Sequence, residues 1–113
     1  MVIIHRGDVV LCDLNPVMGT EQAGIRPVVI LQIDRANKFS PHTIIAPFTT
    51  KIRQAQLSSH VSVPADVGGL TQDVVLCEQI RVIDKQRVIK VLDHLDDLYM
   101  EKIAKAISAI LGL

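Results

Sequence analysis

Several features that mark large classes of protein are absent from this sequence. It has no tryptophan, one tyrosine and two phenylalanines in 113 residues, so its core has to be built mainly from aliphatic side chains, which favour strands. Its 12 basic and 12 acidic residues cancel, so no overall positive field attracts nucleic acid. No apolar run approaches the roughly 20 residues that a membrane-spanning helix needs. These absences predict a soluble protein whose binding chemistry is local.

Cysteine is also scarce. Cys12 and Cys77 each lie inside an apolar run, and no CxxC pair occurs. Thiols in such runs are usually small buried side chains. The first residues, MVIIHRGD, reach charge too early to resemble a secretory signal. We therefore expect a reducing, cytoplasmic location.

The motifs of common enzyme sites are missing as well. The four histidines, His5, His42, His60 and His94, show none of the spacings typical of metal sites. No GxSxG, GxxxxGK or GxGxxG motif is present. The sequence therefore predicts no metal and no cofactor, and an enzyme built from it would have to work with hydroxyls, amides and arginine.

What the sequence does contain is a series of short β-branched segments. Five such runs read as about five or six strands: GDVVLCDL, PVVILQID, TIIAPFTT, HVSVP and VVLCEQIRVID. Pro47 lies inside the third run, and since proline donates no ladder hydrogen bond, that strand is predicted to lie at an edge or to be broken there.

One convincing helix ends the chain. From Asp93, a plausible N-cap, the sequence DHLDDLYMEKIAKAISAILGL places apolar residues on one helical stripe. Strands followed by a single helix favour a small antiparallel barrel with a helix packed against it. We expect residues 1–113 to form a single domain.

The link between the first two predicted strands is unusually long and polar. It runs for twelve residues from Asn15 to Arg26, whereas a simple hairpin needs about two to five. Pro27 disfavours the helical region for Arg26 and so holds it extended at the exit of the link. Its planar guanidinium suits phosphate oxygens, although an arginine that only ties the link to carbonyl groups would fit the same pattern.

Three consecutive residues in the middle of this link are polar as well. Thr20, Glu21 and Gln22 supply donors and acceptors that suit base edges or a peptide backbone. Ordinary solvation of a loop is the alternative. From the residues alone, both interpretations stay open.

Taken in order, several blocks of this sequence resemble the MazF/PemK toxins, which are ribosome-independent endoribonucleases of bacterial toxin–antitoxin pairs. The blocks that carry the resemblance are RGDV, DLNPVMGTEQAGIRPVVI, NKFSPHTIIAPFTT, EQIRVIDKQR and HLDDLYMEKI, which together run nearly end to end. The GTEQAGIRP and EQIR blocks, in this order and spacing, are highly specific. Thr20 and Thr50 stand where many members have serine, and both keep the hydroxyl group.

The resemblance implies a fold and a set of site residues. The fold is mainly β with a C-terminal helix, an SH3-like antiparallel barrel that assembles as a homodimer. The family's catalytic arginine and threonine fall on Arg26 and Thr49. The positions that match its RNA-binding segments are Thr20, Glu21, Gln22, Thr50, Glu78 and Gln79.

The resemblance also implies a reaction and a partner. The 2′-hydroxyl of a single-stranded RNA would attack the adjacent phosphorus and leave a 2′,3′-cyclic phosphate and a 5′-hydroxyl, without a metal. A cognate antitoxin would control the activity. Two alternatives remain: a non-catalytic SH3-like module that binds a peptide or nucleic acid, and an endoribonuclease specific for tRNA or rRNA.

Overall fold

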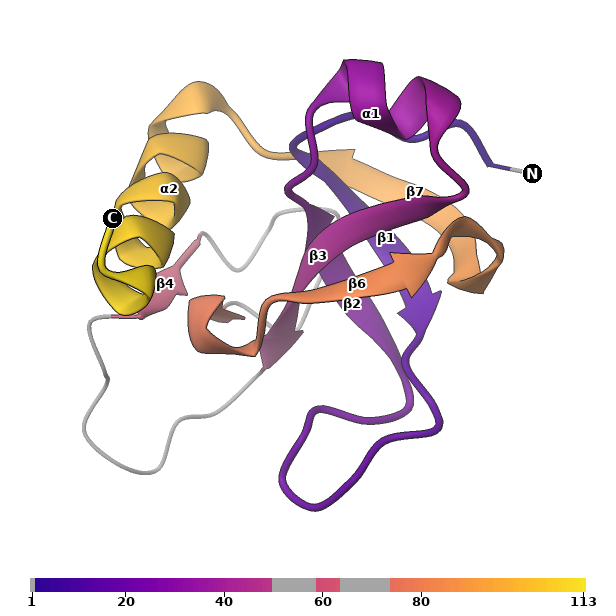
Figure 1. The fold of residues 1–113 in the computed structure, drawn as a ribbon, viewed down its shortest axis with the longest axis horizontal. Helices are drawn as coiled ribbons and strands as arrows, with labels where there is room; N and C mark the ends of the chain where they lie inside the picture. Colours follow the sequence, from indigo (N-terminus) through magenta and orange to yellow (C-terminus); the bar gives the residue numbers. More distant parts are fainter. Residues whose placement is uncertain (1, 50–58, 64–73) are drawn as a thin grey trace.

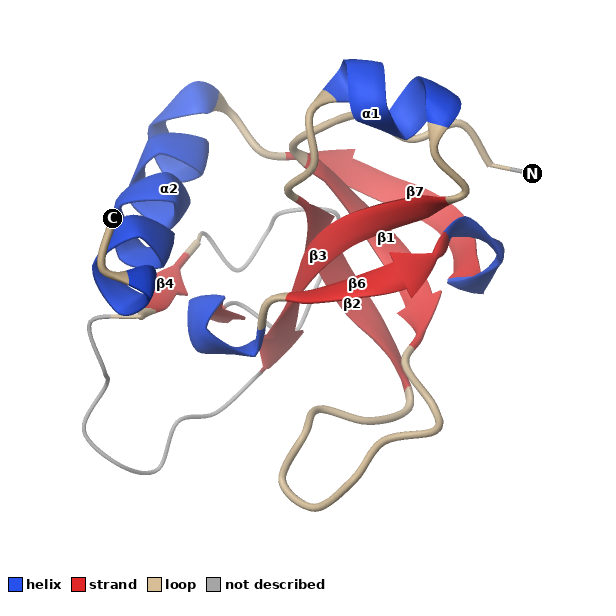
Figure 2. Cartoon of the chain, in the orientation of Figure 1, coloured by secondary structure: helices blue, strands red, loops and turns tan. Residues whose placement is uncertain are grey.

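An antiparallel sheet flanked by two helices forms the structure, a computed structural model that describes residues 2–49, 59–63 and 74–113 (Figures 1 and 2). The strands are β1 (Asp8–Asp13), β2 (Ile25–Ile30), β3 (His42–Thr49), β4 (His60–Ser62), β5 (Val74–Leu76), β6 (Arg81–Asp84) and β7 (Val88–His94). The helices are α1 (Asp34–Phe39) and α2 (Asp97–Leu111), with short helical turns η2 (Cys77–Gln79) and η3 (Lys85–Arg87).

The strands pair in the order β4-β5-β3-β2-β1-β7, and β6 lies beside β3. Every pair is antiparallel. The predicted class, an antiparallel β fold with a C-terminal helix, is confirmed. Within the described ranges the sheet does not close into a complete barrel, because β4 and β7 end the ladder without pairing with each other.

The third strand has a break along one edge. The first part of β3, His42 to Ile45, pairs with β6, whereas Phe48 and Thr49 pair with β5. Pro47 lies between these two pairings. It is paired on the other edge of β3, where it lies opposite Val28 of β2. The predicted break at this proline is thus confirmed. The run VVLCEQIRVID was predicted as one strand. The structure divides it into β5 and β6, with the helical turn η2 between them.

Two predictions about the C-terminal part of the chain were incomplete. Asp93 belongs to β7, and α2 is capped instead by Asp96, whose side chain accepts from the main-chain nitrogen of Tyr99 at 3.3 Å. Strand β7 was not predicted, because its exposed charged residues hide the alternation; it is held by pairing with β1. The six-residue helix α1 was not predicted either, since it is too short to show a helical period.

The sheet is buried on both faces. Adjacent residues of one strand, such as Val9 and Val10 or Val28 and Val29, belong to two different core clusters, as the alternation of side chains requires. Helix α2 covers one face and contributes Met100 to the cluster there. The core is aliphatic, as predicted, apart from one fully buried aromatic side chain, that of Phe48.

The two cysteines are buried in opposite clusters, as the sequence indicates. Burial raises the pKa of Cys77 from 9.0 to about 12 and that of Cys12 to about 11. Both thiols are therefore protonated at neutral pH, and neither supplies a thiolate nucleophile.

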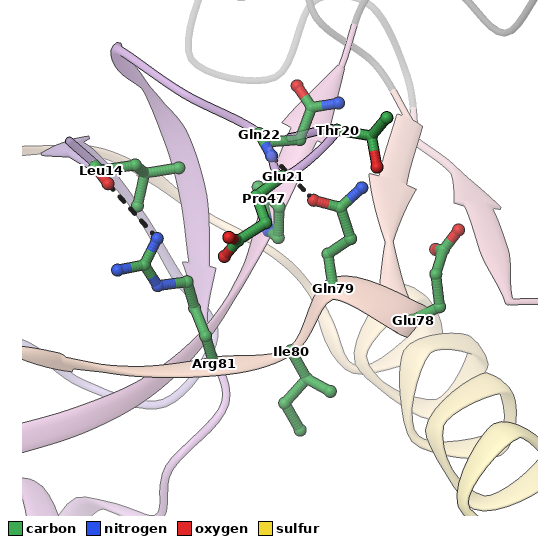
Figure 3. Close-up of a pocket in the computed structure, with 9 residues that line it drawn as sticks. All are labelled: Leu14, Thr20, Glu21, Gln22, Pro47, Glu78, Gln79, Ile80 and Arg81. Carbon is green, nitrogen blue, oxygen red and sulfur yellow. Dashed lines mark hydrogen bonds between the residues drawn. The ribbon is translucent and has the colours of Figure 1, made fainter. Parts of the chain in front are cut away.

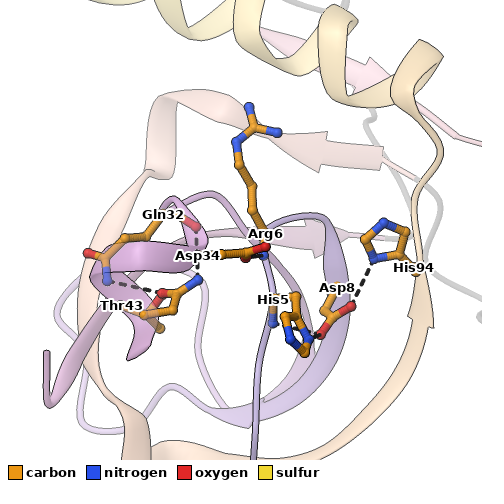
Figure 4. A network of polar contacts seen from close by, with 8 residues as sticks. His5, Arg6, Asp8, Gln32, Asp34, Thr43 and His94 are labelled. Carbon is orange, nitrogen blue, oxygen red and sulfur yellow. Dashed lines mark hydrogen bonds and ion pairs between the residues drawn. The ribbon is translucent and has the colours of Figure 1, made fainter. Parts of the chain in front are cut away.

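Buried polar groups fasten the N-terminal segment and α1 to the sheet (Figure 4). The Asp8 carboxylate, 7% exposed, accepts from the main-chain nitrogen of His5 at 2.8 Å and lies 2.8 Å from Nδ1 of His94. Asn37 accepts from Thr43 Oγ1 at 2.8 Å. These contacts lie at one end of the sheet, and the long link between β1 and β2 lies at the other end. No helix in the described part of the chain is long and apolar enough to cross a membrane.

Candidate functional site

The long link between β1 and β2, residues 14–24, is closed at its base. The main-chain nitrogen of Leu14 donates to the carbonyl of Gly24 at 3.0 Å, and the nitrogen of Gly24 donates to Asn15 Oδ1 at 3.2 Å. Two arginines add charge-assisted bonds: Arg81 Nη1 donates to the Leu14 carbonyl at 3.3 Å, and Arg87 Nη1 donates to the carbonyl of Asn15. The link is therefore an anchored loop rather than a loose connection (Figure 1).

The far part of this loop bends toward η2. Glu21 accepts from the main-chain nitrogen of Met18 at 2.8 Å and so closes a tight turn. The main-chain nitrogen of the next residue, Gln22, donates to Oε1 of Gln79 at 2.9 Å (Figure 3). A bond between residues 57 positions apart thus joins the loop to the break in the sheet.

A pocket of about 430 Å³ lies between the loop, the break in β3 and the segment η2–β6 (Figure 3). The described residues that line it are Leu14, Thr20, Glu21, Gln22, Pro47, Glu78, Gln79, Ile80 and Arg81. Five of the residues predicted to bind RNA are among them: Thr20, Glu21, Gln22, Glu78 and Gln79. The sixth, Thr50, lies outside the described residues.

The charges around this pocket are mixed. Glu21 and Glu78 face it together with Arg81. Nε2 of His60 lies 2.7 Å from Glu78 Oε2, and the histidine side chain is only 8% exposed. The other oxygen, Glu78 Oε1, is buried and has no hydrogen-bond partner among the described residues. Such an unpaired acceptor is rare in folded proteins and is a place where an N–H donor would be stabilised.

Arg26, the predicted catalytic arginine, is half-buried at the start of β2 and held by three hydrogen bonds. Its Nε donates to the carbonyl of Ala23 at 2.8 Å, and its Nη1 donates to the carbonyl of Phe48 at 3.1 Å and to Oε1 of Gln22. These bonds use the Nε hydrogen and both Nη1 hydrogens. Nη2 has no acceptor among residues 2–49, 59–63 and 74–113, so one edge of a fixed guanidinium remains available.

Thr49, the predicted catalytic threonine, lies across from this arginine. The paired residues of β2 and β3 end with Val28 opposite Pro47, and the same antiparallel register continued by two residues would place Arg26 opposite Thr49. Directly opposed residues share one face of a sheet, with Cβ atoms about 5 Å apart. The bond from Arg26 to the Phe48 carbonyl fixes the same proximity. In that register both side chains lie on the face that carries Pro47, and neither Arg26 nor Thr49 is among the described residues that line the pocket.

Two residues of the site were not predicted. Arg81 was missed although it lies within the EQIR block, two positions after Gln79. Alternate residues of a strand share a face, so this spacing was the signal that could have identified it. His60 was missed because its partner Glu78 is 18 residues away and no spacing links them. In the described part of the chain, no group of three or more His, Cys, Asp or Glu side chains is arranged to hold a metal ion.

Known proteins resemble this chain over nearly its whole length. Residues 5–111 match the family model described as "PemK-like, MazF-like toxin of type II toxin-antitoxin system". The chain is 47% identical over 113 residues to the endoribonuclease EndoA of Bacillus subtilis, covering 99% of this chain and 97% of the relative.

Two solved structures share the fold. A crystal structure of MazF from Deinococcus radiodurans superposes with a TM-score of 0.87 at 23% identity, over 100% of both chains. An endoribonuclease from a mycobacterial species, solved in complex with its cognate antitoxin, superposes with a TM-score of 0.81 at 23% identity, over 97% of this chain and 96% of that one.

Proposed function

This chain belongs to the PemK-like, MazF-like family of type II toxins, and from that premise we propose that it is a toxin that cleaves single-stranded RNA at specific sequences without a metal ion. The observation that carries the proposal is the pairing of Arg26 with Thr49. A fixed guanidinium with one unused edge and a hydroxyl group lie on the same face of adjacent strands. This is the donor arrangement that a charged phosphate needs.

The reaction we propose uses the substrate's own nucleophile. The 2′-hydroxyl oxygen attacks the adjacent phosphorus, a P–O2′ bond forms, and the P–O5′ bond breaks. The proton of the 2′-hydroxyl passes to solvent water, and the 5′-oxygen takes a proton from water as it leaves as a hydroxyl. Arg26 and Thr49 donate hydrogen bonds to the non-bridging oxygens, where negative charge accumulates in the transition state.

The pocket next to this pair is suited to reading bases by hydrogen bonds. None of the nine described residues that line it is aromatic, so these residues offer no platform for the base stacking on which most single-strand binders rely. Its side chains instead offer hydroxyl, amide, carboxylate and guanidinium groups, which match the edges of unpaired bases. The carboxylate of Glu78 is among the acceptors that line this pocket, and exocyclic amino groups of bases supply N–H donors.

The first prediction concerns the cleavage products. In the presence of EDTA, the purified chain should cut a long single-stranded RNA into fragments with 2′,3′-cyclic phosphate and 5′-hydroxyl ends. Polynucleotide kinase should label the new 5′ ends without prior phosphatase treatment, and sequencing of these ends would give the recognised motif. Cleavage that stops in EDTA, or that leaves 5′-phosphates, would contradict the proposed chemistry.

The same assay separates the two alternatives. A non-catalytic SH3-like module would bind RNA or a peptide and leave the RNA intact. An enzyme specific for tRNA or rRNA would cut those molecules within their unpaired loops and spare an unstructured messenger RNA. Both outcomes are read from one digestion of total RNA. We expect cuts throughout single-stranded messenger RNA.

The second partner of this chain is an antitoxin, because toxins of this family belong to toxin–antitoxin pairs. The mycobacterial endoribonuclease that shares this fold was solved with its cognate antitoxin bound.

A cytoplasmic location is part of the proposal, because the substrate is RNA and both cysteines are free thiols.

We also propose that the chain acts as a homodimer, which is the second prediction. Ile33 at the N-cap of α1, Phe39 at the end of α1 and Val82 on β6 are each more than 60% exposed, and Lys85 fastens the end of β6 to the Ser40 carbonyl at the end of α1. We place these three side chains on the dimer surface, because large exposed apolar side chains that lie together mark interaction surfaces. Phe39→Lys should weaken the dimer by about ten-fold or more, measured by sedimentation velocity.

Leu98→Lys is the matched control, because Leu98 is an exposed apolar residue on α2 rather than on this surface. It should leave the dimer constant unchanged. A wild-type chain that sediments as a monomer at micromolar concentration would refute the dimer without affecting the proposed cleavage chemistry.

A further inference from the structure

We propose that Gln79 is a positioning residue for the catalytic arginine and acts on it through Gln22. The inference rests on the proposed function, because it concerns the geometry of Arg26. Gln79 lies on η2, the loop residue Gln22 lies between, and Arg26 lies at the start of β2. Three separate parts of the chain are thus joined in series.

Two hydrogen bonds make this connection. The main-chain nitrogen of Gln22 donates to Oε1 of Gln79 at 2.9 Å, and Oε1 of Gln22 accepts from Nη1 of Arg26. All three side chains are half-buried. The first bond fixes the main chain of Gln22, and the main chain in turn determines where its side-chain oxygen can reach.

The far part of the loop, residues 18–22, needs this attachment because its other main-chain hydrogen bonds are local. The turn at Glu21 is closed by bonds to Met18 within the loop. Gly19 lies inside this turn and Gly24 follows it, and with φ of 57° and 82° both have backbone that other residues rarely adopt. Among the described residues, the bond to Gln79 is the hydrogen bond that holds the segment 18–22 to η2. Without it, Gln22 would lose its fixed position.

Arg26 depends on Gln22 in the same way. Its Nε and one Nη1 hydrogen bind the carbonyls of Ala23 and Phe48, and Gln22 accepts the remaining Nη1 hydrogen. This third contact fixes the guanidinium plane and so directs Nη2. Since a donor displaced by about 1 Å can reduce catalysis about a hundred-fold, the turnover number should respond to Gln79 even though Gln79 does not touch the arginine.

The inference differs from a direct contact between Gln79 and RNA. Its amide oxygen is already engaged by the loop. A side chain that only binds substrate would change KM when it is removed, whereas a side chain that aims a transition-state donor would change kcat. The two roles therefore give opposite kinetic results for the same variant.

The experiment compares two substitutions at one position in the full-length protein. Gln79→Met keeps the length of the side chain and removes the acceptor oxygen, whereas Gln79→Glu keeps an acceptor for the Gln22 nitrogen. With a short RNA that contains the mapped cleavage site, Gln79→Met should lower kcat about ten- to a hundred-fold with KM within a few-fold of wild type. Gln79→Glu should retain kcat to within a few-fold and raise KM, because its charge repels the RNA.

A double-mutant cycle with Gln22→Met tests the order of the connection. If Gln79 acts through Gln22, the double variant should lose no more of kcat than Gln22→Met alone. Losses that multiply, or a Gln79→Met variant with wild-type kcat and raised KM, would overturn the positioning role. A wild-type chain that cleaves no RNA would instead overturn the proposed function, so the two failures are distinguishable. Thermal unfolding of each variant excludes loss of the fold.

Discussion

Arg26→Ala should lower the rate of RNA cleavage by about a thousand-fold or more while the chain remains folded. The substitution removes a guanidinium whose Nη2 has no acceptor among the described residues. A single preorganised donor to a developing oxyanion contributes about a hundred- to a thousand-fold to kcat, and Arg26 supplies two N–H groups together with a positive charge. The measurement is single-turnover cleavage of a labelled RNA.

Two further variants interpret that result. Arg26→Lys keeps the charge and loses the planar donor geometry, so it should fall between wild type and Arg26→Ala. Arg6→Ala removes an exposed arginine two residues before β1, at the end away from the loop; among the described residues its hydrogen bond to Asp34 is made by the main-chain nitrogen. It should cleave at the wild-type rate. An Arg26→Ala protein as active as Arg6→Ala would remove the arginine from the mechanism.

The second large effect is expected at Thr49. Thr49→Val keeps the β-branched shape that suits the strand and removes the hydroxyl group, so kcat should fall about a hundred- to a thousand-fold. Thr49→Ser is the matched control, because serine restores the hydroxyl and should recover most of the rate. Since Thr49 is half-buried at the end of β3, neither change removes a core contact.

The outcome for the two threonine variants is decisive in combination. Similar rates for Thr49→Val and the wild type would mean that the hydroxyl does not contact the phosphate. Equal losses in Thr49→Val and Thr49→Ser would indicate that the side chain acts through packing rather than through a hydrogen bond. Circular dichroism of both proteins provides the check on folding.

Much of the fold was predictable because its physical signals are local. The alternation of apolar residues in the run around Val9 and the stripe of the last helix are both visible in the sequence, and Pro47 marks the break in β3. By contrast, β7 is a strand because β1 provides its partner. Pairing of this kind is a tertiary contact, and no short window of sequence records it.

The site was predictable to a different extent. Arg26 stood out because Pro27 restricts its backbone, and the loop residues stood out because their link is too long for a hairpin. The contacts that hold them were not predictable: Gln79 reaches Gln22 across 57 residues, and His60 reaches Glu78 across 18. Those bonds exist only once the sheet has brought η2 beneath the loop.

The central claim, that Arg26 and Thr49 act together on one phosphate, is tested most directly by a crystal structure with bound RNA. The RNA would carry the mapped cleavage sequence with a 2′-deoxy nucleotide at the cut site, so that it binds and is not cleaved. The account predicts that Nη2 of Arg26 and the hydroxyl of Thr49 both lie within hydrogen-bonding distance of oxygens of the scissile phosphate. A scissile phosphate held elsewhere, with these two side chains contacting only protein or solvent, would contradict it.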